Sequence, residues 1–483
     1  MNPDIASLEP KEIWSNFSRL NAVPRASKKE EAVRQFIKNF GRDLNLDIEE
    51  DEAGNILIRK PASPGMSERK TVVMQAHLDM VHQKNADIDF DFEQQGINMY
   101  VDGDWIRARG TTLGADNGLG VSAIMGVLAS KEIQHPAIEA LFTIDEETGM
   151  TGALELKENW LTGDILLNLD TEEDNELGVG CAGGIDVTFN TSYTPVNAFD
   201  GVGYLIMVKG LQGGHSGMDI HKGLGNANKI MNRVLWAVKN IVHLSELTGG
   251  NLRNAIPRES VGVVMVAPEH EIVFKESLTQ CRDEILKEYK SLEPDLSIEF
   301  VSCASPNELM PKAAMEGLLC GIQATLSGVY RMSPDINGLV ETSNNLARVR
   351  VKEGYTEWAC LTRSSVESSK WDLVHQLEAV GQLSGCTVEY SGDYPGWAPN
   401  MNSPILELMR QIYIESYNEQ PHVAACHAGL ECGIIGKHYP GLDMISFGPN
   451  ILGAHSPDER ASISSSQKFW DFLCQTLAKI PAK

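Results

Sequence analysis

Five side chains that can bind a metal ion follow apolar stretches spread over most of the chain. They are two histidines and three carboxylates: His77, Asp116, Glu147, Asp170 and His455. None is a cysteine, and imidazole with carboxylate suits zinc, with cobalt or manganese as substitutes. Three protein ligands and an open position are typical of a catalytic site. If Asp116 bridges two ions, each ion has three ligands, so the pattern predicts two metal ions in a hydrolase.

Two further carboxylates lie beside members of this set. Asp79 follows His77 by two residues, and an extended backbone points such side chains to the same side. A carboxylate commonly holds the second nitrogen of a metal-bound imidazole, so we expect Asp79 to orient His77. Glu146 adjoins Glu147, and we expect Glu147 to bind metal while Glu146 acts as the general base. Taken alone, each motif is compatible with an exposed acidic turn, and only the combination supports a site.

The apolar stretches before these residues indicate strands that deliver ligands to one edge of a sheet. Over the first 185 residues or so, helical patterns near 12–19 and 28–42 alternate with strand patterns near 55–59 and 72–75. Residues 114–130 combine small residues with an apolar body, as expected for a helix packed closely against a sheet. The alternation predicts an α/β fold with a layered sheet.

The pattern of predicted strands and helices changes near residue 186. Strand patterns then alternate with long amphipathic helices, predicted at 227–243 and 272–291, and indicate an α+β domain. The helix predicted at 404–417 returns to the pattern of the first 185 residues. His455 must return to ligands supplied before residue 171. We therefore expect a discontinuous catalytic domain, residues 1–186 and 397–483, with residues 187–396 inserted as a second domain.

The bulk composition excludes several classes of partner. With 41 basic and 66 acidic residues, the formal net charge is −25, which disfavours nucleic acid and anionic membranes. No window approaches the ~20 apolar residues of a membrane span. The nine cysteines are odd in number and scattered, which favours reduced thiols in the cytoplasm.

Several phrases carry a family resemblance: QAHLDMV, GTTLGADNGLG, DEETGMTGA, LNLDTEE, GGHSGMDIHKG and GAHSPDER. They resemble the aminoacyl-histidine dipeptidases (peptidase D, cytosol non-specific dipeptidases) of the di-zinc exopeptidase family that includes carnosinase and peptidase V. The resemblance implies a mixed-sheet α/β catalytic domain with an inserted α+β lid, two Zn²⁺ ions and the ligand set above. It also implies a cis peptide bond between Asp116 and Asn117.

The resemblance adds residues in the inserted domain. His215, on a glycine-flanked turn, is expected to stabilise the oxyanion of a tetrahedral intermediate, although such a histidine could instead cap the turn. Asn254 and Arg363 look like the family's lid residues that hold the dipeptide, the guanidinium offering a fork for its carboxylate, and either could instead be structural. Three more residues are left without a role: His221, His427 and Glu431.

The expected function is metal-dependent hydrolysis of dipeptides with a free amino terminus, of broad specificity and including Xaa-His substrates. Asp170 favours dipeptides, because the resemblance associates glutamate at this position with carboxypeptidases and desuccinylases. The nearest alternative is an amidohydrolase acting on N-acyl amino acids. A second is a non-catalytic metal or peptide binder, which would not need Glu146. A homodimer is compatible with the long inserted domain, and the oligomeric state stays open.

Overall fold

The computed structural model describes residues 3–483, which divide into two compact units. Unit 1 runs to Gly180 and includes residues 399–425 and 430–483, and unit 2 comprises residues 181–398 and 426–429. The boundaries expected from the sequence, after residues 186 and 396, fall inside unit 2. The reason at the first boundary is that β9 (Gly183–Ser192) is one continuous strand of unit 2.

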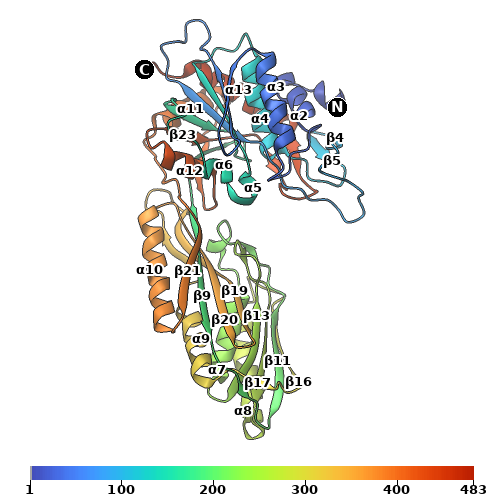
Figure 1. Ribbon diagram of the computed structural model, residues 1–483, viewed down its shortest axis with the longest axis vertical. Coiled ribbons are helices and arrows are strands. Elements are labelled where there is room, and N and C mark those ends of the chain that lie inside the picture. The colour runs from blue at the N-terminus through green and yellow to red at the C-terminus, as the bar shows by residue number, and fades with distance from the viewer. Residues whose placement is uncertain (1–2) are drawn as a thin grey trace. The chain divides into compact units, whose positions relative to one another are not determined.

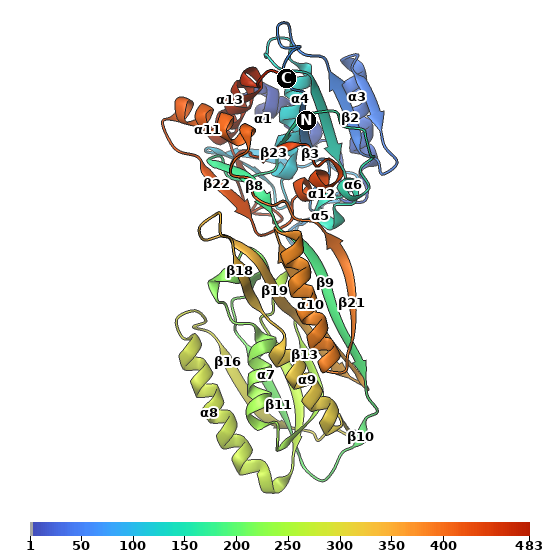
Figure 2. The same cartoon turned by 90° about the vertical axis from the view of Figure 1, so that its left-hand side faces the viewer.

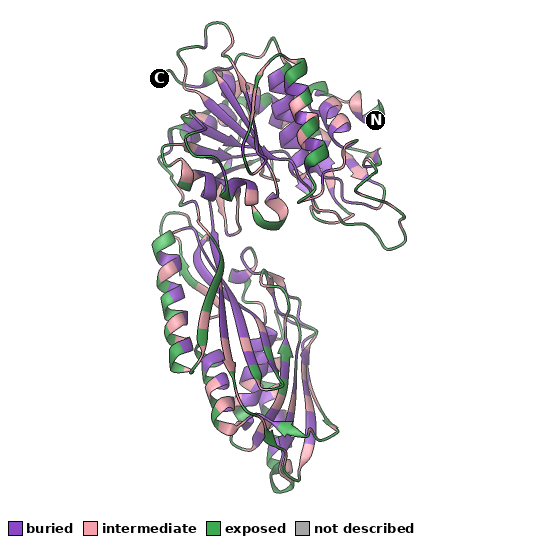
Figure 3. Cartoon of the chain, in the orientation of Figure 1, coloured by how far each residue is buried: buried purple, intermediate pink, exposed green. Residues whose placement is uncertain are grey.

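Unit 1 is built on an eight-stranded sheet in the order β1, β2, β6, β3, β7, β23, β8, β22. The bounds are β1 (Asp47–Glu50), β2 (Ile56–Lys60), β3 (Val72–His77), β6 (Ile138–Thr143), β7 (Ile165–Asn168), β8 (Glu176–Cys181), β22 (His422–Cys426) and β23 (Asp443–Ser446). The neighbours β6, β3, β7 and β23 run parallel. Parallel strands that are covered on both faces have nearly continuous apolar sequences. Strands β3 and β6 are buried along their whole length, and Figure 3 shows this part of the sheet as buried.

Helices cover the unit 1 sheet (Figure 1). Their bounds are α1 (Pro3–Ala6), α2 (Lys11–Leu20), α3 (Glu31–Asp43), α4 (Ala115–Ala129), α5 (Glu146–Gly149), α6 (Thr151–Leu154), α11 (Pro404–Tyr417), α12 (Glu431–His438) and α13 (Ile463–Lys479). Helix α4 packs against β3 and α2, and its buried small and apolar residues allow this close approach. A smaller sheet contains β4 (Met99–Asp102), β5 (Trp105–Ala108), β24 (Ile451–Leu452) and β25 (Arg460–Ser462).

Unit 2 contains a nine-stranded sheet in the order β16, β11, β15, β13, β19, β20, β9, β21, with β18 paired to β19. Its strands besides β9 are β11 (Val202–Lys209), β13 (Val242–Gly249), β15 (Ser260–Val266), β16 (Ser297–Cys303), β18 (Gly328–Met332), β19 (Val340–Lys352), β20 (Tyr355–Ser364) and β21 (Thr387–Tyr394). Two short pairs accompany it, β10 (Val196–Asn197) with β17 (Glu308–Leu309) and β12 (Gly214–His215) with β14 (Ala255–Ile256).

Four long helices complete unit 2: α7 (Ala227–Val238), α8 (Glu271–Tyr289), α9 (Lys312–Ala324) and α10 (Glu367–Leu383). Figure 2 shows α7, α9 and α10 side by side along the sheet, and the three share one apolar core with it. The helix predicted at 227–243 was too long. It ends at Val238, because Val242 and His243 pair with β15 as the first residues of β13.

The two ends of the inserted segment meet. The backbones of Cys181 and Trp397 exchange hydrogen bonds of 3.0 and 2.9 Å. The two ends of the 181–398 segment therefore lie side by side, as an inserted domain requires. The predicted α/β fold with an inserted α+β domain is confirmed.

Candidate metal centre

Three neighbouring parallel strands end at one edge of the unit 1 sheet and carry most of the expected ligands. His77 is the last residue of β3, and Asp170 follows the end of β7. Glu147 lies in α5, shortly after the end of β6. Because β3 pairs in parallel with both β6 and β7, the three carboxyl ends share one edge.

Asp116 connects two groups of potential ligands. Its Oδ1 lies 3.1 Å from Nε2 of His77, and Asp170 Oδ1 is 3.5 Å from the same nitrogen. Its Oδ2 lies 3.1 Å from Nε2 of His455, which is 3.0 Å from Glu147 Oε2. In each group the ligand atoms lie within 4.8 Å of one another: His77, Asp116 and Asp170, and Asp116, Glu147 and His455. Asp116 is the residue common to both groups.

The electrostatics of this edge fit divalent cations. Glu147 Oε1 is buried and accepts no hydrogen bond within residues 3–483. Burial raises the pKa of Glu147, and burial together with the charge of Asp116 raises the pKa of Glu172 to about 8. Bound cations stabilise such crowded carboxylates in their charged form. The donor set of imidazole and carboxylate therefore suits the metals expected from the sequence.

Asp79 contacts both the candidate ligand His77 and the start of α5, the helix that carries Glu147. Its Oδ1 lies 3.3 Å from Nδ1 of His77, on the ring side opposite the Asp116 contact. The same carboxylate accepts the backbone N–H groups of Glu146 at 3.1 Å and Glu147 at 3.2 Å. Asp79 thus contacts the imidazole and also positions α5, whereas the sequence predicted only the first contact.

Glu146 lies close to the ligands without sharing their hydrogen bonds. It offers an oxygen within 4.8 Å of ligand atoms of His77 and Glu147. Burial raises the pKa of Glu146 well above its ordinary value. Burial therefore favours the protonated form of this carboxyl group over the charged form.

The peptide bond between Asp116 and Asn117 is cis, as the family resemblance implied. Asn117 donates from Nδ2 to the carbonyl of Leu169 at 2.7 Å and to Asp170 Oδ1. The residue after the bridging aspartate therefore contacts the loop that carries another ligand.

Glu431 belongs to a network of hydrogen-bonded polar side chains on the strands that carry the candidate ligands. Its Oε2 accepts hydrogen bonds of 2.6 Å from Gln75 and Thr143, and Gln75 Oε1 accepts one of 2.6 Å from Asn168. Burial raises the pKa of Glu431 to about 8. Sequence reasoning left Glu431 without a role. The only local signal is that Gln75 and Asn168 each precede a ligand by two residues.

The expected unit 2 residues lie close together within that unit. The pairing of β12 with β14 places His215 opposite Ala255, next to Asn254. Arg363, in β20, is buried and donates to Ser216 Oγ at 3.3 Å and to Tyr394 Oη at 2.9 Å. All of these contacts lie within unit 2.

The protonation of His215 follows from its surroundings. Nδ1 accepts backbone hydrogen bonds from Gly217 at 3.2 Å and Met218 at 3.0 Å, which leaves Nε2 as the donor. Burial and the charge of Arg363 lower the pKa of His215 to about 4. Nδ1 thus caps the local turn, the alternative given in the sequence analysis, and the low pKa favours the neutral imidazole at pH 7.

The two unassigned histidines differ. His221 is exposed on the 3₁₀ helix η1 (Ile220–Lys222), whereas His427 is buried with Nε2 2.7 Å from Ser343 Oγ. The glycine-flanked context in the sequence did not separate these two environments.

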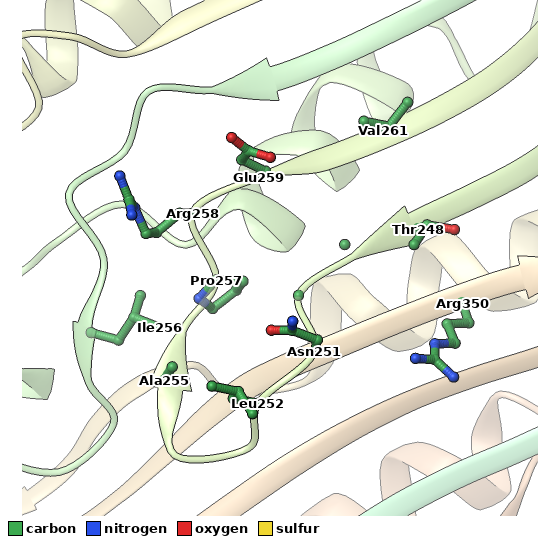
Figure 4. Close-up of a pocket in the computed structure, with 12 residues that line it drawn as sticks. Thr248, Asn251, Leu252, Ala255, Ile256, Pro257, Arg258, Glu259, Val261 and Arg350 are labelled. Carbon is green, nitrogen blue, oxygen red and sulfur yellow. The ribbon is translucent and has the colours of Figure 1, made fainter. Parts of the chain in front are cut away.

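A cavity of about 750 Å³ in unit 2 borders β14, the strand that pairs with the His215 strand (Figure 4). It is lined by the 248–252 and 255–259 segments with Val261 and Arg350. None of the candidate site residues lines it, so the site is defined by its chemistry rather than by this cavity.

Comparison with known proteins places these groups in context. Residues 73–479 match the model of peptidase family M20/M25/M40. The chain is 43% identical over 484 residues to a cytosol non-specific dipeptidase of Escherichia coli K12, an alignment covering 99% of this chain and 100% of that one.

Solved structures agree in fold. An aminoacylhistidine dipeptidase from Vibrio alginolyticus matches with a TM-score of 0.92 and 42% identity, covering 99% of this chain and 98% of that one. A tripeptidase from Staphylococcus aureus matches with a TM-score of 0.57 and 15% identity, covering 98% and 99%. The second likeness shows the fold alone.

Proposed function

Because the chain belongs to peptidase family M20/M25/M40, we propose that it is a metal-dependent dipeptidase that cleaves dipeptides with a free amino terminus. The observation that carries this proposal is the pair of ligand groups sharing Asp116, with Glu146 beside them. Two-metal sites of this kind activate water and stabilise the attacking and leaving groups of a displacement. The full-length similarity to two dipeptidases supports the substrate class.

The family implies a divalent metal, and we assign two Zn²⁺ ions, with Co²⁺ or Mn²⁺ as substitutes. His77, Asp116 and Asp170 hold one ion, and Asp116, Glu147 and His455 hold the other. Zinc, when bound, polarises a carbonyl group and brings the pKa of water to about 7. Asp79 fixes the His77 ring by its contact with Nδ1.

The remaining chemistry belongs to side chains of the protein. Glu146 accepts a proton from the attacking water and returns it to the amine leaving group. The neutral imidazole of His215 offers its Nε2–H to the oxyanion. Arg363 offers its guanidinium to the substrate carboxylate, and Asn254 contributes beside His215. The family resemblance and the grouping of these residues within unit 2 support the last two roles.

The free amino terminus is held near Asp170. The aspartate at this position favours dipeptides over N-acyl amino acids by family resemblance. We expect broad side-chain specificity that includes Xaa-His substrates such as carnosine-like dipeptides, in line with the names of the two relatives.

The location follows from composition and relatives. None of the nine cysteines, all within residues 3–483, forms a disulfide. Across that range, every helix falls short of the length and apolarity that a membrane crossing needs. We propose that the protein is cytoplasmic, in line with the name of the Escherichia coli relative, and that it acts without nucleic acid or membrane partners, which its net charge of −25 disfavours. We also propose that it forms a homodimer.

Paired assays with Ala-His and N-acetyl-alanine test the substrate class. The metal-loaded protein is expected to release both amino acids from Ala-His and to leave the acetylated compound intact. Cleavage of N-acetyl-alanine alone would show that the protein is a deacylase and that the dipeptidase proposal is wrong.

A Glu146→Gln variant tests the mechanism. Loss of a general base typically costs about 10²–10⁴ in rate, so kcat is expected to fall by that factor while both metals stay bound. Turnover is measured with Ala-His and metal content by elemental analysis. Glu155→Gln, at an exposed glutamate of the same unit, serves as the control and should keep wild-type kcat. Full turnover in Glu146→Gln would favour another base.

A further inference from the structure

A buried glutamate joins the segment that carries His455 to the segment that carries Asp116. Glu459 is 2% exposed and lies just before β25. Its Oε2 accepts the N–H groups of Leu113 at 2.7 Å and Gly114 at 3.0 Å, and its Oε1 accepts that of Ala115 at 2.7 Å. The N–H of Asp116, at 3.4 Å, also points to Oε1.

Leu113 and Gly114 directly precede α4, and the N–H groups of Ala115 and Asp116 are the first of the helix and lack partners inside it. The residue preceding the helix, Gly114, has a φ of 71° and carries no side chain that could cap it. A carboxylate at a helix N-terminus is also favoured by the helix dipole. Glu459 therefore caps α4 from a segment more than 340 residues away in the chain.

A buried arginine contacts the carbonyl side of the same turn. Arg25 is 1% exposed, and its Nη1 donates at 3.1 Å to the carbonyls of both Leu78 and Asp79. Its Nη2 donates to the carbonyl of Gly114. Leu78 and Asp79 directly follow His77, so Arg25 joins the segment of that ligand to the turn before Asp116.

The two side chains oppose each other in charge across the Gly114 peptide. Burial lowers the pKa of Arg25 to about 10, which leaves it charged at neutral pH, and the nearby carboxylate of Glu459 opposes this effect of burial. Both buried side chains hydrogen-bond backbone groups of the same turn. Between them, Glu459 and Arg25 connect three ligand-bearing segments: residues 77–79, 113–116 and 455–459.

We propose that Glu459 and Arg25 are positioning residues that hold His77, Asp116 and His455 at metal-binding separation. Neither offers an atom to the metal or the substrate. Their role is to fix the backbone from which three ligands project, so their loss weakens metal binding before it changes the chemical step. The inference rests on the proposed metal site, not on the choice of dipeptide.

Glu459→Gln tests this inference, because an amide keeps the size of the side chain and replaces one accepting oxygen with a donor. Metal affinity is measured by titrating the chelator-treated protein with Co²⁺ and following the visible absorption of the bound ion. Affinity is expected to fall about 10–100-fold, while kcat at saturating metal falls less than tenfold. Arg25→Lys, which retains the charge without the fork, should give the same pattern.

Glu139→Gln is the matched control. Glu139 is also 2% exposed and accepts the backbone N–H groups of Thr162 at 2.8 Å and Gly163 at 3.0 Å, at the start of β6 and away from the ligand edge. Its loss removes bonds of the same kind in the same unit. The fold stability should drop in both variants, and Co²⁺ affinity only in Glu459→Gln.

Three outcomes would overturn the inference. Wild-type Co²⁺ affinity in folded Glu459→Gln and Arg25→Lys would show that the pair does not position ligands. An equal loss in Glu139→Gln would mark a general effect of destabilisation. Failure of both variants, and of Glu459→Asp, to fold would show a purely structural role. A wild-type protein that binds Co²⁺ but leaves Ala-His intact would instead refute only the dipeptidase proposal.

Discussion

At the scale of single residues, burial decides the protonation state of His427. His427 is 5% exposed, and burial followed by the charge of Arg363 lowers its pKa to about 3. His427 therefore stays neutral at pH 7 and contacts Ser343. Arg363 supplies the positive charge near this imidazole. The sequence could not distinguish this buried imidazole from the exposed His221.

The low pKa of His427 predicts a pH-dependent stability. Below the unfolded-state pKa of about 6.5, the unfolded chain binds a proton that the folded chain excludes, so stability is lost as the pH falls toward 3. At pH 5 this amounts to roughly 2 kcal/mol, from about 1.4 kcal/mol per pKa unit. His427→Gln should flatten the difference in unfolding free energy between pH 7 and pH 5, measured with urea.

His270→Gln is the control, because His270 is exposed at the end of the 3₁₀ helix η2 (Pro268–His270). It should retain the wild-type pH dependence. An equally steep loss of stability in His427→Gln would contradict the assignment of a buried neutral imidazole.

At the scale of elements, glycines set how closely α4 approaches its neighbours. A Cβ at Gly120 would collide with the side chain of Asn117, in the first turn of α4, and with the carbonyl of Leu169, in the loop that carries Asp170. A Cβ at Gly126 would meet Trp470. Gly120 and Gly126, two of the small residues of the helix predicted at 114–130, therefore allow α4 to pack closely against its neighbours.

Gly120→Ala is expected to destabilise the protein by about 1–3 kcal/mol, as overpacking of a tight contact does. The matched variant is Gly317→Ala in α9, where the nearest atom to an added Cβ is at an ordinary 3.4 Å. That substitution should stabilise by about 0.5–1 kcal/mol, because alanine is the better helix former. Denaturant unfolding measures both, and a stabilised Gly120→Ala would refute the close contact.

At the scale of the whole molecule, different interactions are expected to stabilise the two units. The core cluster of unit 2 lies wholly between Ile185 and Leu377, while the proposed metal ligands all belong to unit 1. Metal that binds only one unit stabilises that unit by mass action. The two units are therefore expected to respond differently to a chelator.

Calorimetry with and without EDTA tests this expectation. At a metal concentration 100-fold above its dissociation constant, removal costs about 2.7 kcal/mol, so the transition of unit 1 should shift to lower temperature. The transition of unit 2, assigned with the isolated 181–398 fragment, should stay in place. A single transition that shifts as a whole would show that the units unfold together.

The sequence by itself determined the α/β class, the insertion and the identity of the candidate ligands. Three of the five candidate ligands, His77, Glu147 and Asp170, follow apolar strands of the large sheet, as the sequence predicted. Asp116 instead lies in the first turn of α4, and His455 follows β24 of the smaller sheet. The helix at 404–417 was predicted with the bounds that the structure gives to α11. The end of α7 and the start of unit 2 were not, because pairing with β15 and the continuity of β9 decide them.

The tertiary structure alone decided what surrounds the ligands. Glu459 meets Leu113 across 346 positions, and Glu431 meets Gln75 across 356, so no local pattern joins these residues. The second contact of Asp79, to the backbone of α5, likewise depends on two strands becoming neighbours. Residue types are set locally, but separations, burial and the resulting charge states arise only when distant segments pack together.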